Sequence, residues 1–491
     1  MVFSTPLFCF YFLVLTLAVY YVVPRRWRNG VLLVSSLVFY YWGERSYTVI
    51  MFLSTAIDYT HGLLVERCKA KGNDRGARMA VASSVIFNLA LLFYFKYWDF
   101  LASSLQAVVA ALSLSLLASC GSKDNGSASS LQAMGLTFMQ VKNIHLPIGI
   151  SFYTFQTMSY TVDVYRGDAR AQRSILNFGT FVTLFPQLIA GPIIKYKDLG
   201  DQIDRRTCSA EKFASGVQVF MVGMAKKLLI ANNLGQLWDA SLIGTGGMSV
   251  AGAWLGVAAF SLQLYFDFSG YSDMAVGLGR MLGFEFLPNF DHPYVSRSIT
   301  EFWRRWHISL GTWFKEYLYI PLGGSRVGHI RKYLNLLIVW GATGLWHGAS
   351  WNYLIWGLYF GVLLVLEKRF WLDWLGRHRV FAHVYTLFLV LVSWAIFAIE
   401  DFDRLRQYLK VMFGLGGVPV VNSAFGYCLM NYLPSLVIAC IAATPVGVTV
   451  YGRLSEQKKM VLSGVLVAGG LVVCTAYLVA STYNPFLYFR F

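Results

Sequence analysis

The chain has 491 residues, of which 56% are hydrophobic and only 13% are charged, and its mean hydropathy is +0.53. Soluble domains carry about 25% charged residues, so this composition excludes a water-soluble enzyme and predicts an all-α polytopic integral membrane protein. The formal net charge of +16 comes from short basic blocks between apolar runs. Such blocks are typical of cytoplasmic loops, and we do not expect nucleic acid to be a partner.

Apolar runs follow one another along the whole chain. The first, 6–23, precedes its arginines and has no cleavage site, so we interpret it as a retained transmembrane helix rather than a signal peptide. Further apolar segments lie at about 31–42, 47–65, 79–97, 101–118, 144–164, 176–194, 215–233, 249–266, 335–350, 352–366, 381–399, 428–447 and 461–481. The segments near 31–42, 144–164 and 335–350 are short, and we expect them to be tilted, re-entrant or buried. We predict about 11–13 spans, with short helices between them, in one membrane domain over 1–491.

The basic loops predict how the chain is oriented in the membrane. The loop 66–78 carries five basic residues against two acidic ones, and the segments 24–30 and 452–460 are also basic. Because Lys and Arg accumulate on the cytoplasmic side, these three loops are predicted to be cytoplasmic and both termini to lie outside.

No metal site is predicted. The seven cysteines occur singly, without a Cys-x-x-Cys pair, and no His-x-x-x-His or carboxylate spacing surrounds the histidines. A disulfide framework is equally unsupported.

The region 267–332 interrupts the apolar pattern, because it is polar and aromatic over about 65 residues. Backbone of this kind is buried in protein, lines a wet cavity or lies at the cytoplasmic face. Ser298 and Glu301 are spaced as a capping box that opens a helix. On that helix we expect an apolar stripe of Trp303, Trp306 and Leu310, with Arg304 and Arg305 on another face.

Two of the eight histidines lie in apolar or aromatic surroundings: His307 in WRRWHISL and His347 in TGLWHGASW. His347 is the only ionisable residue of the segment 335–350, and such a residue within a membrane indicates a functional site. The alternative is a packing histidine bonded to a backbone carbonyl. Gly344 and Gly348 would allow another backbone or a substrate to approach closely. A neutral His347 could act as general base on a hydroxyl that attacks a thioester, while His307 orients it, binds substrate or shares the proton.

Two further groups of charged residues have open interpretations. Asp267 and Asp273 could cap helices or pair with arginines of the following segment, or they could line a substrate tunnel. A basic cluster consists of Arg304, Arg305, Lys315, Arg326, Arg331 and Lys332. It is equally typical of a positive-inside face and of a site for the phosphates of acyl-CoA or for an acidic carrier protein. Trp303, Arg304 and Arg305 are therefore candidates for substrate or donor binding.

The sequence resembles the membrane-bound O-acyltransferases (MBOAT), and within them the branch that acetylates alginate. The matching stretches are LPIGISFYTFQTMSYTVDVYRGD (146–168), LFPQLIAGPI (184–193), QLYFDFSGYSDMAVGLG (263–279), SITEFWRRWHISLGTWFKEYLYIPLGGSR (298–326), GLWHGASWNYLIWG (344–357) and NPFLYFRF (484–491). The resemblance covers nearly the whole chain. The segments 119–143, 412–430 and 452–460 do not match family motifs.

The resemblance implies a ring of transmembrane helices around a catalytic tunnel, with the region 267–350 as catalytic core and His347 and His307 as catalytic residues. It implies a multi-pass protein of the bacterial cytoplasmic (inner) membrane, in contact with lipid. No bound cofactor is expected. An acyl group, here acetyl, would come from acetyl-CoA or another thioester, including an acyl carrier, and pass to an exported polysaccharide such as alginate. An extracytoplasmic SGNH-type transferase would be the partner.

The same resemblance leaves peptidoglycan, cellulose and teichoic acid as alternative acceptors. A non-enzymatic export component is an alternative of a different class. A transporter would show repeat symmetry and several charges along a pathway, and neither is visible in the sequence.

The chain ends in an aromatic motif, residues 484–491. Within it, Phe486, Tyr488 and Phe491 follow the pattern Phe-x-Tyr-x-x-Phe, which resembles a C-terminal motif of this system. The simple interpretation is an aromatic anchor at the membrane interface. The alternative is that Tyr488 enters the outer mouth of the tunnel and carries the acyl group as a phenolic ester.

Overall fold

The computed structural model describes residues 1–119, 141–189, 191–243, 248–480 and 487. Within these ranges the regular elements are all helical, which confirms the predicted all-α class. The α-helices are α1 (Leu13–Val22), α2 (Arg28–Glu44), α3 (Thr48–Ala70), α4 (Asp74–Leu92), α5 (Trp98–Ser119), α7 (Ile150–Arg166), α8 (Ile175–Thr183), α9 (Phe185–Leu188), α10 (Tyr196–Asp204), α11 (Ala210–Ala225), α12 (Asn232–Ile243), α13 (Val250–Met281), α14 (Ile299–Arg305), α15 (Ile308–Phe314), α16 (His329–His347), α17 (Trp351–Leu366), α18 (Leu372–Arg377), α19 (Arg379–Ala398), α20 (Phe402–Met412), α21 (Ser423–Ala442), α22 (Val446–Gly452) and α23 (Glu456–Ala480).

Short π-helical and 3₁₀ segments interrupt or join these helices. The π-helical segments are η1 (Leu7–Phe12), η4 (Phe93–Tyr97), η5 (Lys226–Ala231), η7 (Lys315–Tyr319) and η8 (Glu367–Trp371). The 3₁₀ segments are η2 (Arg25–Trp27), η3 (Arg45–Tyr47) and η6 (Pro293–Val295). Single π-turns inside α-helices are frequent near functional sites.

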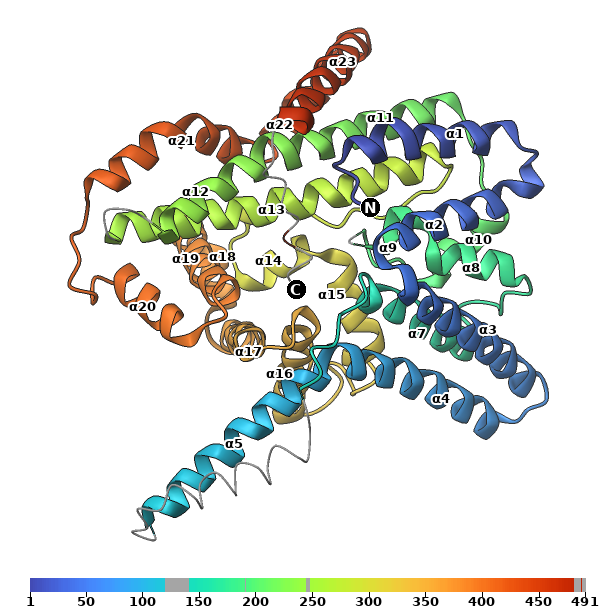
Figure 1. Cartoon of the computed structure of the whole chain (residues 1–491), viewed down its shortest axis with the longest axis horizontal. Coiled ribbons are helices and arrows are strands. Elements are labelled where there is room, and N and C mark those ends of the chain that lie inside the picture. Colours follow the sequence, from blue (N-terminus) through green and yellow to red (C-terminus); the bar gives the residue numbers. More distant parts are fainter. Residues whose placement is uncertain (120–140, 190, 244–247, 481–486, 488–491) are drawn as a thin grey trace.

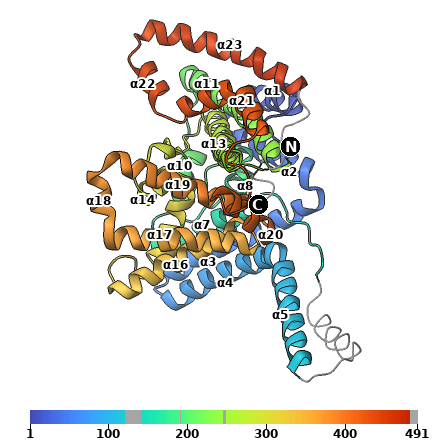
Figure 2. The same cartoon turned by 90° about the vertical axis from the view of Figure 1, so that its left-hand side faces the viewer.

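The long helix α13 crosses the middle of the molecule, and α11 and α12 run alongside it (Figure 1). The short helices α14 and α15 lie between α13 and the pair α16–α17, while α5 and α23 project from the body at opposite ends (Figures 1 and 2). The short helices α14 and α15 are thus enclosed by longer helices, among them α13 (Figure 1).

Glycines let α11 and α13 approach closely. A Cβ atom on Gly216 would lie 2.6 Å from the carbonyl oxygen of Gly277, and one on Gly223 would lie 2.4 Å from that of Gly270. Small residues at such contacts permit backbone-to-backbone packing of membrane helices. This contact fixes α13, which carries Asp267 and Phe268 into the centre of the protein.

Seven helices within the described residues are long and apolar enough to cross a membrane: Arg25–Ala70, Asp74–Leu112, Ala210–Ser241, Val250–Met281, Arg379–Ala398, Ser423–Ala442 and Glu456–Ala480. This count differs from the predicted 11–13 spans. One reason is that neighbouring apolar segments, such as 79–97 and 101–118, belong to one long helix. Another is that central helices such as α17 are shorter than a full span. The segment near 144–164 forms α7, in which fourteen of seventeen residues are buried, as predicted for an interior helix.

Candidate active site

His307 lies at a break between α14 and α15. Trp306 has an extended backbone, and His307 itself adopts the left-handed conformation with φ of 46°. Asn289, from the loop before α14, stabilises this break. Its carbonyl oxygen accepts the N–H of Ile308 at 2.9 Å, and its side-chain oxygen accepts the N–H of Ser309 at 3.1 Å.

The same amide oxygen of Asn289 orients the imidazole of His307. Nδ1 of His307 lies 3.2 Å from Oδ1 of Asn289. Because an amide oxygen only accepts hydrogen bonds, Nδ1 carries a proton. Burial lowers the pKa of His307, so that the ring is neutral and Nε2 keeps its lone pair. Nε2 is buried and has no hydrogen-bond partner among the described residues. His307 is therefore held as a neutral ring with one unused acceptor.

The prediction of a continuous apolar stripe on one helix is wrong. Ser298 does cap α14, since its hydroxyl accepts the N–H of Glu301 at 2.9 Å. The helix ends before Trp306, however, so Trp303 and Leu310 lie on separate helices. The contacts that end the helix come from a loop outside the periodic segment, and local periodicity carries no sign of them.

His347 is the last residue of α16. Gly344 serves the close approach of another backbone, one of the two predicted alternatives, and Gly348 makes room for a side chain of the same neighbouring helix, α17. A Cβ atom on Gly344 would lie 2.3 Å from the carbonyl oxygen of Tyr353 in α17, and one on Gly348 would lie 2.2 Å from the ring of Tyr353. The α16–α17 contact thereby fixes where the imidazole of His347 points.

The two histidines meet around one indole. The ring centroid of Trp346 lies 5.1 Å from that of His347 and 6.0 Å from that of His307. The ring of His347 also contacts Trp356 and Phe397. His347 is only 6% exposed and His307 only 1%, and neither ring nitrogen of His347 has a hydrogen-bond partner among the described residues. A packing histidine would be bonded to a carbonyl, so these unbonded nitrogens favour the catalytic interpretation.

A cavity of about 540 Å³ reaches His307 from one side. Its polar and charged lining residues are Thr300, Trp303, Arg304, His307, Thr312, Lys315, Tyr319, Ser325, Thr343 and Lys368. We call it the basic cavity. Its volume lies in the range of small-molecule sites, and it includes two of the three candidates for donor binding, Trp303 and Arg304.

Three basic side chains that line the basic cavity have no carboxylate partner among the described residues. Arg304, Lys315 and Lys368 form no ion pair with any carboxylate in the part of the chain that the structure describes. Burial, together with the nearby charges of Lys332 and Arg304, lowers the pKa of Lys368. Arg305 differs from these residues, because it pairs with Asp291 at 3.0 Å and with Glu301 at 3.0 Å. Arg304 thus lines the cavity without a carboxylate partner among the described residues, whereas Arg305 joins the loop of Asp291 to α14.

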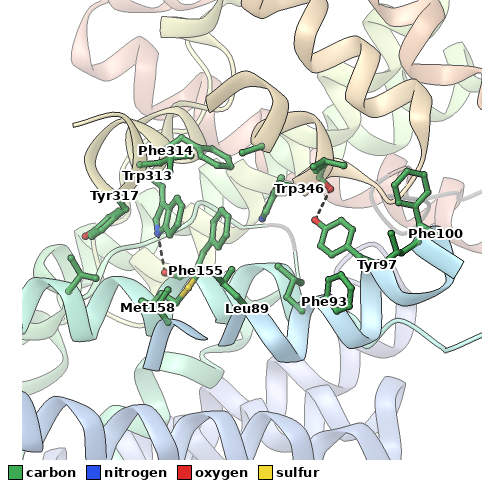
Figure 3. A pocket seen from close by; sticks show the side chains of 17 residues that line it. Leu89, Phe93, Tyr97, Phe100, Phe155, Met158, Trp313, Phe314, Tyr317 and Trp346 are labelled. Carbon is green, nitrogen blue, oxygen red and sulfur yellow. Dashed lines mark hydrogen bonds between the residues drawn. The ribbon is translucent and has the colours of Figure 1, made fainter. Parts of the chain in front are cut away.

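A second cavity of about 610 Å³ lies on the far side of Trp346 and Phe314. Its wall is apolar and aromatic and comes from α4, η4, α5, α7, α15, η7 and α16 (Figure 3). Polar atoms at its edge are already used within the protein: Trp313 donates to the carbonyl of Phe155, and Tyr97 donates to that of Leu345. This apolar cavity supplies no charge to the histidine pair.

Asp267 and Asp273 both form ion pairs, but not with arginines of the following segment. Asp267 pairs with Lys227 at 2.7 Å, and both side chains are almost fully buried. Asp273 pairs with Lys226 at 2.6 Å. Both lysines lie in η5, which precedes α13, so the predicted pairing partners were wrong. The ion pairs tie η5 to α13, and Phe268, next to Asp267, contacts the ring of His307 at 4.7 Å.

Leu487, the one residue of the C-terminal motif that the structure describes, lies at Asp267. Its backbone N–H donates to Oδ2 of Asp267 at 2.8 Å, and the residue is 5% exposed. Phe486, Tyr488 and Phe491 lie outside the described residues. Leu487 packs in the same apolar cluster as Trp306.

Sequence reasoning missed Lys96. This lysine lies in η4 and is 9% exposed, and its ammonium donates to the carbonyl of Trp346. The available signal was a lone cation within the apolar segment 79–97, the same kind of signal that identified His347.

No group of three or more histidine, cysteine or acidic residues that could hold a metal ion occurs within the described ranges.

Comparisons with known proteins show the family of this chain. Residues 72–398 match the model of the MBOAT, membrane-bound O-acyltransferase family. The chain is 38% identical to a probable alginate O-acetylase AlgI of Pseudomonas putida, over the full length of both proteins. It is 41% identical to that of Pseudomonas aeruginosa, over 85% of this chain and 75% of the relative. It is 30% identical to a peptidoglycan O-acetyltransferase of Helicobacter pylori, over 86% of this chain and 81% of the relative.

Proposed function

Because this chain belongs to the membrane-bound O-acyltransferase family and is an O-acyltransferase, we propose that it moves an acetyl group from a cytoplasmic thioester to an exported polysaccharide of the alginate type. The observation that carries the proposal is a pair of buried histidines with unbonded ring nitrogens, both in contact with the ring of Trp346, of which His307 lines the basic cavity. Family membership also removes the alternative of a non-enzymatic export component.

The donor is acetyl-CoA, bound in the basic cavity. Arg304, Lys315 and Lys368 offer unpaired cations for its phosphates, and the cavity leads from them to His307. The negatively charged phosphates of acetyl-CoA would compensate the positive charges of these three side chains. A protein-bound acyl carrier would need the same cations for an acidic surface and is the alternative donor.

A chain of contacts supports the proposal that the donor binds from the cytoplasm. The predicted cytoplasmic loop 66–78 joins the segment after α7, because Glu66 pairs with Arg173. At the end of α7, Arg166 donates to the carbonyl of Glu316 at 3.0 Å. Glu316 is next to Lys315 in the wall of the basic cavity. Lys315, which lines the basic cavity, is therefore linked to the side that positive-inside counting predicts to be cytoplasmic. The protein would accordingly lie in the bacterial inner membrane.

In the acyl transfer, His347 acts as general base. It takes the proton of the acceptor hydroxyl while the hydroxyl oxygen attacks the thioester carbonyl carbon. The carbon–sulfur bond then breaks, and the proton passes from His347 to the leaving thiolate, so that CoA departs as the thiol. His307, fixed by Asn289, accepts a hydrogen bond through Nε2 and shares the proton during the transfer.

The acceptor hydroxyl that we propose is the phenol of Tyr488. Its neighbour Leu487 is bonded to Asp267, one residue from Phe268, which contacts His307. The position of Leu487, the residue before Tyr488 in the sequence, supports this proposal. A phenolic ester stays activated, because a phenol with a pKa of about 10 leaves more readily than a sugar alkoxide. The serine of an SGNH-type partner would collect the acetyl group outside and pass it to the polymer.

Alginate is the preferred polymer because the relatives named for alginate are 38–41% identical to this chain. The peptidoglycan O-acetyltransferase is 30% identical, and a teichoic acid D-alanyltransferase of Bacillus subtilis is 27% identical over 52% of this chain. Peptidoglycan, cellulose and teichoic acid remain the alternative acceptors.

The experiment uses membranes that contain the protein and acetyl-CoA labelled in the acetyl group, with alginate and the SGNH-type partner added separately. We expect transfer of the label to the protein with donor alone, and to alginate when partner and polymer are both present. Membranes with His347→Ala are the control. Label that stays on acetyl-CoA in the wild type would overturn the donor assignment. Label that passes to another wall polymer but not to alginate would overturn the acceptor assignment.

A further inference from the structure

Lys96 is a buried cation inside a membrane-spanning helix. It lies in η4, in the candidate span Asp74–Leu112, and is 9% exposed. No described carboxylate forms an ion pair with it. A lysine at membrane depth is costly, and such residues are found where they serve a function.

The ammonium of Lys96 is directed at the end of the helix that carries His347. It donates to the carbonyl of Trp346 and lies 3.4 Å from the carbonyl oxygen of His347. A third contact, also at 3.4 Å, is the hydroxyl of Ser151 in α7. The ammonium also lies 5.8 Å from the ring centroid of Trp346, the indole between the two histidines.

These carbonyls need donors, because the last turn of a helix leaves its C=O groups without partners inside the helix. The neighbouring residue of η4 supplies another donor, since the Tyr97 hydroxyl donates to the carbonyl of Leu345 at 2.8 Å (Figure 3). Consecutive residues of η4 thus cover consecutive carbonyls of α16. The two donors differ in charge: Tyr97 is neutral, whereas Lys96 brings a cation to the negative end of the helix dipole.

We propose that Lys96 is a positioning residue for acyl transfer, whose ammonium holds the C-terminal end of α16 and thereby fixes the imidazole of His347 against Trp346. This inference rests on the proposed function, in which His347 is the general base. The cation has a second effect, because a positive charge beside His347 opposes its protonation and keeps the base ready to accept a proton.

The charged groups around His347 are few. From η4 and from the α14–α15 break, the titratable neighbours are Lys96 and His307, both of which act on His347 electrostatically. From α17 and α19, the contacts are Trp356 and Phe397, which carry no charge. Loss of the Lys96 charge is therefore expected to move the acidic limb of the pH–rate profile for acyl transfer to higher pH.

The test compares Lys96→Met, Lys96→Arg and Tyr97→Phe in the full-length protein, with acetyl-CoA as the probe. For Lys96→Met we expect kcat to fall about 10- to 100-fold with KM for acetyl-CoA within about twofold, because the base is displaced while the donor site is untouched. The acidic limb of the pH–rate profile moves to higher pH, since the charge that opposed a proton on His347 is gone. Lys96→Arg keeps the positive charge and is expected to show the wild-type pH–rate profile. Tyr97→Phe is expected to show the wild-type pH–rate profile even if its kcat is lower.

Lys96→Gln covers the case in which Lys96→Met does not accumulate in the membrane. It keeps a donor for the carbonyls, lacks the charge and is expected to show the same shift of the profile. A wild-type kcat and profile in Lys96→Met, or the same shift in Tyr97→Phe, would overturn the inference. Failure of the proposed function is recognised separately, because the wild-type protein would then transfer no acetyl group from acetyl-CoA.

Discussion

The two histidines of the site lie at two different kinds of helix break. His307 lies between two short helices and is held by Asn289, so its proton is fixed on Nδ1 and its ring has one defined free nitrogen. His347 ends a long helix, and what is held there is its backbone, through Lys96, while neither ring nitrogen is bonded. One ring is oriented through its side chain and the other through the helix that carries it.

This difference supports the proposed roles of the two histidines. A base must gain and lose a proton during each cycle, and an imidazole with two unbonded nitrogens can do so without breaking an existing bond. A ring whose Nδ1 already donates to an amide is suited to a fixed role as acceptor and orienting group. The comparison therefore supports His347, rather than His307, as the general base. The following predictions, from the largest effect to the smallest, test this assignment.

Replacement of His347 by alanine is expected to have the largest effect. Removal of a general base lowers the rate by about 10²–10⁴-fold, and His307→Ala should be severe but leave more residual activity. The measurement is the acetyl ester signal of the polymer by NMR, with protein abundance in the membrane as control. A strain with His307→Ala that retains less acetylation than one with His347→Ala would reverse the two roles.

Replacement of Tyr488 by phenylalanine distinguishes a covalent acyl carrier from an aromatic membrane anchor. The change keeps the aromatic ring and removes only the hydroxyl, so a covalent relay predicts loss of polymer acetylation at normal protein levels. The ester content of the polymer again measures the outcome. Full acetylation in this variant would leave Tyr488 as an anchor and require direct transfer to the partner or the polymer.

Replacement of Asn289 by alanine tests the orientation of His307. The amide oxygen holds both the imidazole and the N–H of Ser309, so its loss should lower kcat about 10- to 100-fold through misplacement of the ring. Asn289→Asp keeps an acceptor at this position and should retain more activity. Steady-state kinetics on membranes would measure both variants, and equal losses in the two would argue against a role in orientation.

The smallest effect is expected in the basic cavity. Arg304→Gln should raise KM for acetyl-CoA about tenfold, corresponding to about 1.4 kcal/mol, with kcat unchanged because the histidines are untouched. Arg305→Gln is the matched control, since Arg305 pairs with Asp291 and Glu301 instead of facing the cavity. If KM rises equally in both variants, the distinction between the two arginines is wrong.

The sequence predicted those features that depend on local composition. The apolar runs indicated an all-α membrane protein, which the structure confirms for the described residues. The lone ionisable residue in an apolar segment indicated His347, and its catalytic role stays a prediction. The spacing of Ser298 and Glu301 also placed the start of α14 correctly.

Features that depend on contacts between distant segments were not predictable in this way. The break at His307 is stabilised by Asn289, eighteen residues earlier. Asp267 finds its partner Lys227 in another helix, 40 residues away. Lys96 meets the end of α16 from a position 250 residues earlier in the chain, and no periodicity carries that information.

The central claim is that His347 performs the chemistry at the end of a donor site that does not need it for binding. A single-turnover experiment on the purified full-length protein tests both parts on one sample, by measuring the affinity for acetyl-CoA and the rate at which free CoA thiol appears. For His347→Ala, we predict wild-type affinity and a rate of CoA release that is lower by about 10²–10⁴-fold. Release of CoA at the wild-type rate by His347→Ala would contradict the assignment of His347 as the general base.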